Sequence, residues 1–368
     1  VATITNWLQS QGLRVDEVAP GRRSIEFSGT VGQVEAAFHT QMNRVEVDGE
    51  SHIANTLPLE IPADLAPVVE GTLSLHDFHS KAMSHGVSEA QYTAGSSHYL
   101  SPNDYATIYN VRPLWTAGTD GTGQSIAVIS RTNVVGTDFT TFRTNMGLPA
   151  NPLQVVLNGA DPGIVSGDDV EADLDMEWAG ALAKNAAVKL IVSKSTTTSD
   201  GIDLSAQYAV NNNSAPIITI SYGACEAAMG SAGTTFYSNL WQQAAAQGQS
   251  VFISTGDSGA AGCDSGTSAT HGFGINGLGS SAYNVAVGGT QFLDTTSPTT
   301  YWSASNSAGF SSALSYIPET VWNESGAVTG GSGLWAGSGG YSLYIARPSW
   351  QASIPTPAGA TAGVRLVP

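Results

Sequence analysis

Five short apolar runs, separated by stretches with helical periodicity, limit what this chain can fold into more than any other feature. The runs cover residues 126–129, 188–192, 217–220, 251–253 and 285–287. Continuous apolar runs of this length are typical of parallel strands that are buried on both faces. Residues 171–183 and 236–246 repeat apolar positions every three to four residues, as amphipathic helices do. The alternation predicts an α/β fold with a doubly wound parallel sheet, whose ligands bind beyond the carboxyl ends of the strands.

The N-terminal fifth of the chain has a different pattern. Trp7 and Leu8 open an apolar helical face, residues 25–27 alternate like a strand, and residues 32–39 have helical spacing. Residues 80–101 are mostly polar, which is typical of a linker that proteases cut. We therefore expect a small α+β domain at 1–78, a linker with a cleavage site at 79–101, and a large α/β domain at 102–368.

Composition narrows the class of partner. A formal net charge of −17 with only 13 Lys and Arg argues against nucleic acids and anionic membranes, which require basic surfaces. Charged residues are 12% of the chain, which is low and favours an exported, extracellular protein. Cys225 and Cys263 are the only cysteines, and they are either buried thiols or a disulfide; export favours the disulfide. We expect a monomer.

Histidine and metal chemistry have little support in the large domain. Six of the seven histidines precede residue 102, so a Ser-His-Asp triad in the large domain would require His271. A lone histidine is more often structural than catalytic. Neither HExxH nor paired cysteine and histidine spacings occur, so we expect no metal ligands within this chain.

Carboxylates are stronger candidates. Glu171 and Asp175 are four residues apart, on one face of an expected helix, where two acids can share one proton. Asp257 lies between glycines after the run at 251–253, and residues 221–223 follow another run with small side chains that let a peptide lie alongside. The alternatives are ordinary: a solvated acidic first turn for the pair, and a turn or helix cap for Asp257.

Together, these segments resemble the sedolisin family of serine-carboxyl peptidases, especially its bacterial branch related to kumamolisin. The matching stretches follow the family order at 104–109, 171–178, 221–223, 254–257, 287–290, 318–323 and 348–351. Residues 1–78 resemble the family's activation propeptide, most clearly at 27–30, 37–39 and 61–62.

The resemblance implies a subtilisin-like fold and a secreted zymogen that cleaves proteins or peptides at acid pH, with its propeptide as an intramolecular inhibitor. Glu171 matches the base that activates a serine, Asp175 the acid that orients that base, and Asp257 the acid that donates to the oxyanion. Ser221, Tyr222 and Gly223 match the substrate-binding strand. A carboxylate suits this chemistry because it can still accept a proton below about pH 5, where a histidine is protonated.

The family's nucleophile lies in a Gly-Thr-Ser segment followed by proline, and its calcium ligands lie near the C-terminus. Both are expected beyond Pro368, so we expect an incomplete sheet and an inert chain. Residues 265–268 imitate the serine motif but lack the following proline and lie only about ten residues after Asp257. Ser130 stands where kumamolisin-like relatives carry a glutamate, and Tyr222 where they can have tryptophan.

Two other functions stay open at this stage. The first is a catalytically inactive homologue that keeps a peptide groove without a nucleophile. The second is a Gly-, Ser- and Thr-rich adhesion domain, which predicts no clustering of Glu171, Asp175 and Asp257.

Overall fold

The computed structural model describes residues 1–368 except for 48, 84–92, 95–96, 99, 265–266 and 327–332. Its centre is a parallel sheet of six strands in the order β14-β13-β11-β8-β10-β9. The strands are β8 (Ser125–Ser130), β9 (Gln154–Leu157), β10 (Ala187–Val192), β11 (Ile217–Ile220), β13 (Ser250–Ser254) and β14 (Val285–Val287).

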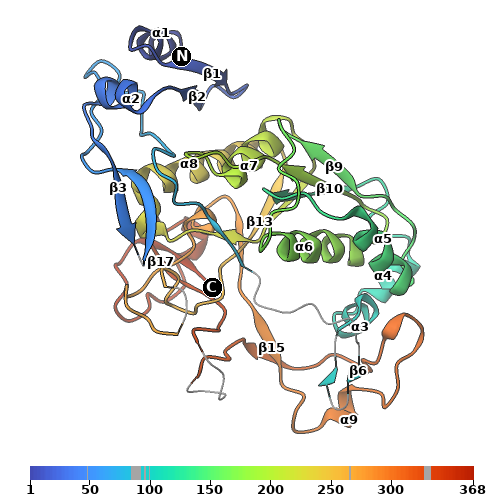
Figure 1. The fold of residues 1–368 in the computed structure, drawn as a ribbon. Coiled ribbons are helices and arrows are strands. Elements are labelled where there is room, and N and C mark those ends of the chain that lie inside the picture. Colours follow the sequence, from blue (N-terminus) through green and yellow to red (C-terminus); the bar gives the residue numbers. More distant parts are fainter. Residues whose placement is uncertain (48, 84–92, 95–96, 99, 265–266, 327–332) are drawn as a thin grey trace.

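Helices cover both faces of the sheet (Figure 1). α6 (Asp169–Leu182) packs on one face, where Met176 and Ala172 meet Val128 of β8. α7 (Gly201–Asn211) and α8 (Glu226–Ala246) cover the other face, where Ile202 and Trp241 share a core with β8 and β11. Neighbouring residues of one buried strand therefore enter opposite cores, and the expected doubly wound α/β sheet is confirmed.

The sequence pattern located the centre of this sheet but not its border. All five apolar runs are strands of the sheet, whereas β9 and α7 had not been expected. β9 lies at the edge of the sheet beside β10, and two of the three residues in its short apolar run, 155–157, are exposed.

The N-terminal unit has its own small core. It consists of α1 (Ala2–Ser10), β1 (Arg14–Val18), β2 (Ile25–Ser28), α2 (Val31–Phe38), β3 (Met42–Val47) and β4 (Glu50–Asn55). Leu8 of α1 and Phe38 of α2 are buried together, with Trp7 edge-on to Phe38. The first turn of α2 is stabilised by a reciprocal capping box between Thr30 and Gln33.

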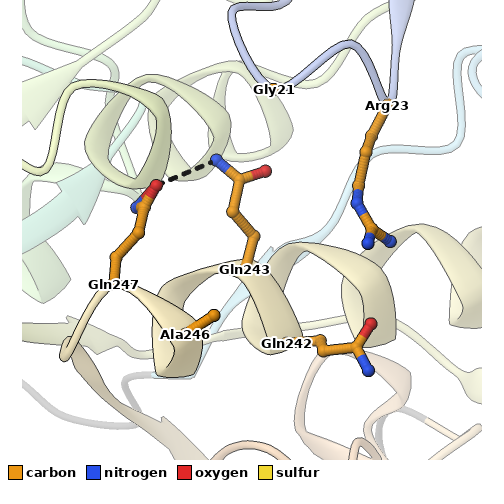
Figure 2. A pocket seen from close by; sticks show the side chains of 6 residues that line it. All are labelled: Gly21, Arg23, Gln242, Gln243, Ala246 and Gln247. Carbon is orange, nitrogen blue, oxygen red and sulfur yellow. Dashed lines mark hydrogen bonds between the residues drawn. The ribbon is translucent and has the colours of Figure 1, made fainter.

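This unit rests on the outer helices of the sheet. Gln207 of α7 accepts a hydrogen bond from Ser24 Oγ and donates one to Glu26, at 3.1 and 3.0 Å. Asn239 of α8 donates to Glu70 at 3.0 Å. Figure 2 shows Arg23 extending past the side of α8 that carries Gln242. These contacts are hydrogen bonds between polar side chains, as is common where two domains of one chain meet.

The remaining elements surround the carboxyl-end edge and the periphery of the large domain. They are β5 (Lys81–Ala82), β6 (Thr93–Ala94), β7 (Ser97–His98), α3 (Pro102–Ile108), α4 (Arg112–Thr116), α5 (Gly136–Asn145), β12 (Tyr222–Gly223), β15 (Thr290–Phe292), α9 (Pro298–Tyr301), β16 (Glu319–Val321), β17 (Gly340–Ala346) and β18 (Val364–Val367). Among the described residues, no helix is long and apolar enough to cross a membrane.

Asp104 connects α3 to a distant part of the chain. Its side chain is fully buried, accepts from Ser101 to close the capping box of α3, and accepts 2.7 Å hydrogen bonds from the backbone of Ser312 and Ala313. Several hydrogen-bond donors compensate for the burial of this carboxylate. If it is removed, those buried N–H and O–H groups have no acceptor and no water to replace it.

We expect Asp104→Ala to lower the free energy of unfolding by about 3 kcal/mol or more, because buried N–H donors lose their acceptor. Urea denaturation followed by circular dichroism measures this, with the exposed Asp64→Ala as the control. Equal midpoints for the two variants would contradict the assigned role of Asp104.

Candidate active site

The carboxyl ends of β11 and β13 form the floor of the candidate site. Ile220 is paired with Ile253, so the segments that follow these strands start side by side. The side-chain amide of Asn276 donates to the carbonyls of Tyr222 and Ser254, at 3.0 and 2.9 Å. This amide holds the two segments together. The sequence analysis missed Asn276 because its hydrogen-bond acceptors are backbone carbonyls of distant segments.

α6 carries the acid pair to this edge. Glu171, in the first turn, is 3% exposed, and Asp175 lies one turn later. Ser221 Oγ donates to Asp175 Oδ1 at 2.7 Å, which links the helix to the segment after β11. Burial raises the pKa of Asp175 to about 6, although hydrogen bonds with Ser221 and Glu171 oppose the rise. A hydrogen bond between two carboxyls requires a proton on one of them, so the pair keeps a proton at a pH where an isolated aspartate is ionised.

A buried ion network fixes the start of α6, and the sequence analysis did not find it. Arg131, which follows β8, donates to both carboxylate oxygens of Asp168, at 2.6 and 3.1 Å. It also pairs with Asp200 at 3.3 Å, and its guanidinium lies 5.3 Å from the ring centroid of Tyr222. Asp168 immediately precedes α6, so Arg131 connects the helix with Glu171 to the segment with Tyr222. The available signal was position, because Arg131 directly follows the end of a predicted strand.

The third candidate acid lies in the loop after β13. Gly256 has a φ of +107°, which other residues rarely adopt, and a side chain there would press on Ser338. The loop backbone is fixed by Ser338 N–H donating to Gly256 O at 2.8 Å and Ala336 N–H donating to Asp257 O at 2.9 Å. Asp257 is therefore held at the same edge of the sheet as the acid pair. The catalytic roles of all three acids stay predictions.

The linker reaches this edge as a short strand. β5 pairs antiparallel with β12, with Ala82 opposite Tyr222 and Lys81 opposite Gly223. The rest of the expected linker is described only in part, because residues 84–92, 95–96 and 99 lie outside the described residues. The boundaries of the linker and of the two domains stay predictions.

The competing motifs take ordinary positions. His271 is more than half exposed, and its Nδ1 lies 2.7 Å from Asp264. In the imitation serine motif, residues 265–266 lie outside the described residues, and Ser268 is exposed. No group of three or more His, Cys, Asp or Glu within the described residues is arranged to hold a metal ion. The calcium expected from the resemblance therefore has no candidate ligands here, and no chemical step is assigned to it.

Cys225 and Cys263 form a disulfide in the structure, with their Cα atoms 4.7 Å apart. Cys225 immediately precedes α8, and Cys263 follows the loop that contains Asp257. The bridge therefore ties the segment after β12 to the Asp257 loop.

Comparisons with known proteins identify the family of this chain. The family model described as pro-kumamolisin, activation domain, matches residues 1–78. Sedolisin of Pseudomonas sp. (strain 101) is 31% identical over 380 residues, covering 100% of this chain and 61% of that protein. The chain belongs to the sedolisin and kumamolisin family of peptidases, S53.

Other relatives support the same assignment. Xanthomonalisin of Xanthomonas sp. (strain T-22) is 30% identical, with 96% of this chain and 46% of that protein covered. Kumamolisin of Bacillus sp. (strain MN-32) is 27% identical, with 98% and 62% covered. The chain thus spans about half to three fifths of the length of these relatives.

The fold agrees with that of a solved family member. The structure of Pseudomonas sedolisin, a serine-carboxyl proteinase complexed with two molecules of pseudo-iodotyrostatin, matches with a TM-score of 0.56 and 28% identity. The match covers 74% of this chain and 70% of that one. The subtilisin-like sheet expected from the sequence is confirmed by this match.

Several other carboxyls also have raised pKa values, which makes stability depend on pH. Burial, with nearby carboxylates, raises the pKa of Asp173 to about 6, of Glu177 to about 8 and of Asp203 to about 7. A carboxyl whose pKa is higher in the folded than in the unfolded state stabilises the fold at low pH, and this contribution is lost as pH rises through the folded value.

We therefore expect the thermal midpoint of this chain to fall as the pH rises from about 4 to about 8. Glu177→Gln should flatten the upper part of this decline, since glutamine stays neutral, whereas the exposed Glu324→Gln should not. Scanning fluorimetry across that pH range measures both, and a midpoint that increases towards pH 8 would refute the shifts.

Proposed function

We propose that this chain is the larger part of the precursor of an endopeptidase that hydrolyses proteins at acid pH through a Ser-Glu-Asp triad. The observation that carries the proposal is a peptide strand lying on residues 222–223, beside a buried acid pair. A protease cleft has this arrangement, because an extended substrate adds as a strand and its carbonyl must meet a base.

In the proposed reaction, Glu171 accepts the proton of a serine hydroxyl as the oxygen attacks the substrate carbonyl. Asp175, held by Ser221, orients Glu171 and shares its proton. Asp257, in its neutral form, donates a hydrogen bond to the oxyanion, which an ionised carboxylate would repel. The serine is expected in sequence beyond Pro368, where the family's Gly-Thr-Ser segment lies.

A groove beside Asp175 offers an apolar surface on which a further part of the protein could pack. It measures about 320 Å³ and is lined by apolar side chains of α6 and the sheet, including Leu174, Trp178 and Phe252. Leu174 and Phe252 are exposed, as are Val285 and Val287 of the edge strand β14. A doubly wound sheet normally covers such a face with a helix. We propose that the nucleophile-bearing part of the protein packs here.

We further propose that the precursor is exported and that its propeptide inhibits it by holding linker residues 81–83 in the cleft. The disulfide supports export, because such bonds persist in oxidising compartments. The pairing of β5 with β12 supports inhibition, because the main-chain groups that a substrate would use are already engaged. Calcium binding is proposed only for the part of the protein beyond Pro368.

A catalytically inactive peptide-binding homologue is the second candidate. The pairing of β5 with β12 favours it equally, since seating a peptide on this strand requires no nucleophile. The two candidates differ in one respect only: the inactive homologue binds peptides that include residues 77–90 without ever cutting them.

For the complete protein, we expect a bell-shaped dependence of kcat/KM on pH, centred on the acid side of neutrality. Activity should fall on the alkaline side as Asp257 loses its proton, and on the acid side as the pair of Glu171 and Asp175 gains a second one. Glu171→Gln should reduce kcat about a hundredfold or more, and Asp257→Asn should flatten the alkaline limb.

Initial rates on a denatured protein substrate between pH 2 and 8 measure these effects, with His271→Ala as the control that leaves the profile unchanged. An optimum near pH 8, or loss of activity in His271→Ala with full activity in Glu171→Gln, would show that a histidine is the base.

A further inference from the structure

The last described residues before the linker gap lie in the candidate site as a bound peptide would. Ala82 and Lys81 pair with Tyr222 and Gly223, and Met83 N–H donates to Ser221 O at 3.0 Å. Three consecutive residues thus continue one antiparallel ladder along the strand after β11. Peptides that enter protease clefts bind by the same kind of main-chain addition.

Met83 is the residue of this segment whose side chain enters the site. A Cβ atom added to Gly223 would overlap the Met83 methyl group, and one added to Gly256 would lie 3.7 Å from it. Met83 therefore fills the space between two glycines on adjacent strand ends, and the second of these immediately precedes Asp257. Lys81, two residues earlier, is exposed.

The main chain of Met83 is linked to the acid pair through Ser221. Ser221 accepts from Met83 N–H through its carbonyl and donates to Asp175 through its hydroxyl. Ser221 therefore connects Met83 to the acid pair. The side chain of Met83 lies next to Gly256, the residue before Asp257.

An anchor at Ser80 fixes this register. Asp200 accepts from Ser80 N–H at 2.6 Å and from Ser80 Oγ at 2.5 Å, and it is held in turn by Arg131. Ser80 and Asp200 are both buried. A slip by one residue would break these hydrogen bonds and exchange the two faces of the strand, so Met83 is the residue presented to the site.

We propose that the peptide bond following Met83 is the first bond cut when the precursor matures. The proposal rests on the proposed function above. The serine oxygen of the complete protein bonds to the Met83 carbonyl carbon, its proton passes to Glu171, and the bond to the nitrogen of the next residue breaks as that nitrogen takes the proton. Water then hydrolyses the acyl ester, which leaves Met83 with a free carboxylate and Ser84 with a free amine.

The same geometry predicts which side chain the site prefers immediately before the cleaved bond. The space between Gly223 and Gly256 takes an apolar side chain that is not branched at Cβ, whereas an aspartate there would lose hydration without a partner. Met83→Leu should therefore retain first cleavage within about threefold, and Met83→Asp should slow it at least tenfold. Asp64→Asn, at an exposed position of the N-terminal unit, is the control and should process like the unchanged chain.

The experiment follows the complete precursor after a shift from neutral to acid pH, with mass spectrometry of the earliest products. We expect a fragment ending at Met83 and a new N-terminus at Ser84, at a rate independent of protein concentration because the bond already lies in its own cleft. A first cut elsewhere, while the bond after Met83 stays intact, overturns the inference.

A synthetic peptide of residues 77–90, given to the mature enzyme, tests the same bond without the folding of a precursor variant, and cleavage after Met83 is expected. Cleavage of a denatured protein substrate without cleavage of this peptide after Met83 overturns this inference alone. Failure to cleave either substrate at any pH overturns the proposed function and this inference with it.

Discussion

The hydrogen bond from Ser221 to Asp175 is the interaction on which the rest of the site depends. It joins α6, which carries both acids, to the segment on which the linker lies. Without this link, the position of α6 relative to this segment would depend on packing across the sheet and on the contacts of Arg131 at the start of the helix, which leaves tenths of an ångström undetermined where proton transfer tolerates little. The bond also holds one oxygen of a carboxyl whose pKa is raised to about 6, so it sets both geometry and proton affinity.

A second constraint surrounds the first. Arg131 binds Asp168 at the start of α6, pairs with Asp200 at the start of α7, and lies over the ring of Tyr222. Asp200 also accepts the two hydrogen bonds from Ser80. One cation therefore connects the helix of the acid pair, the peptide-binding segment and the start of the linker. Burying such a charge requires several acceptors, and the structure provides them from three elements.

The sequence predicted the strands and helices that have a periodic apolar pattern. It missed the single contacts between residues that are distant in sequence. Five apolar runs identified five of the six strands of the central sheet. The spacing of Glu171 and Asp175 placed both acids on one face of a helix. β9 was missed although it carries an apolar run of three residues, 155–157, because runs this short do not by themselves identify a strand. Asn276 and Arg131 were missed because their partners are far away in sequence, and neither propensity nor periodicity encodes such pairs. The position of Met83 in the site likewise required the register of β5 on β12.

The most direct test of this account is the titration of the Asp175 carboxyl in the chain of residues 1–368. Carbon-13 NMR of aspartate carboxyl carbons between pH 3 and 8, assigned by the loss of one signal in Asp175→Asn, measures it. The account predicts a midpoint raised to about 6, which falls outside the ordinary range for aspartate, and a further rise in Ser221→Ala because a hydrogen bond to the ionised form is lost. A midpoint at or below 4, unchanged in Ser221→Ala, would contradict the claim that burial and proton sharing prepare this pair for chemistry in acid.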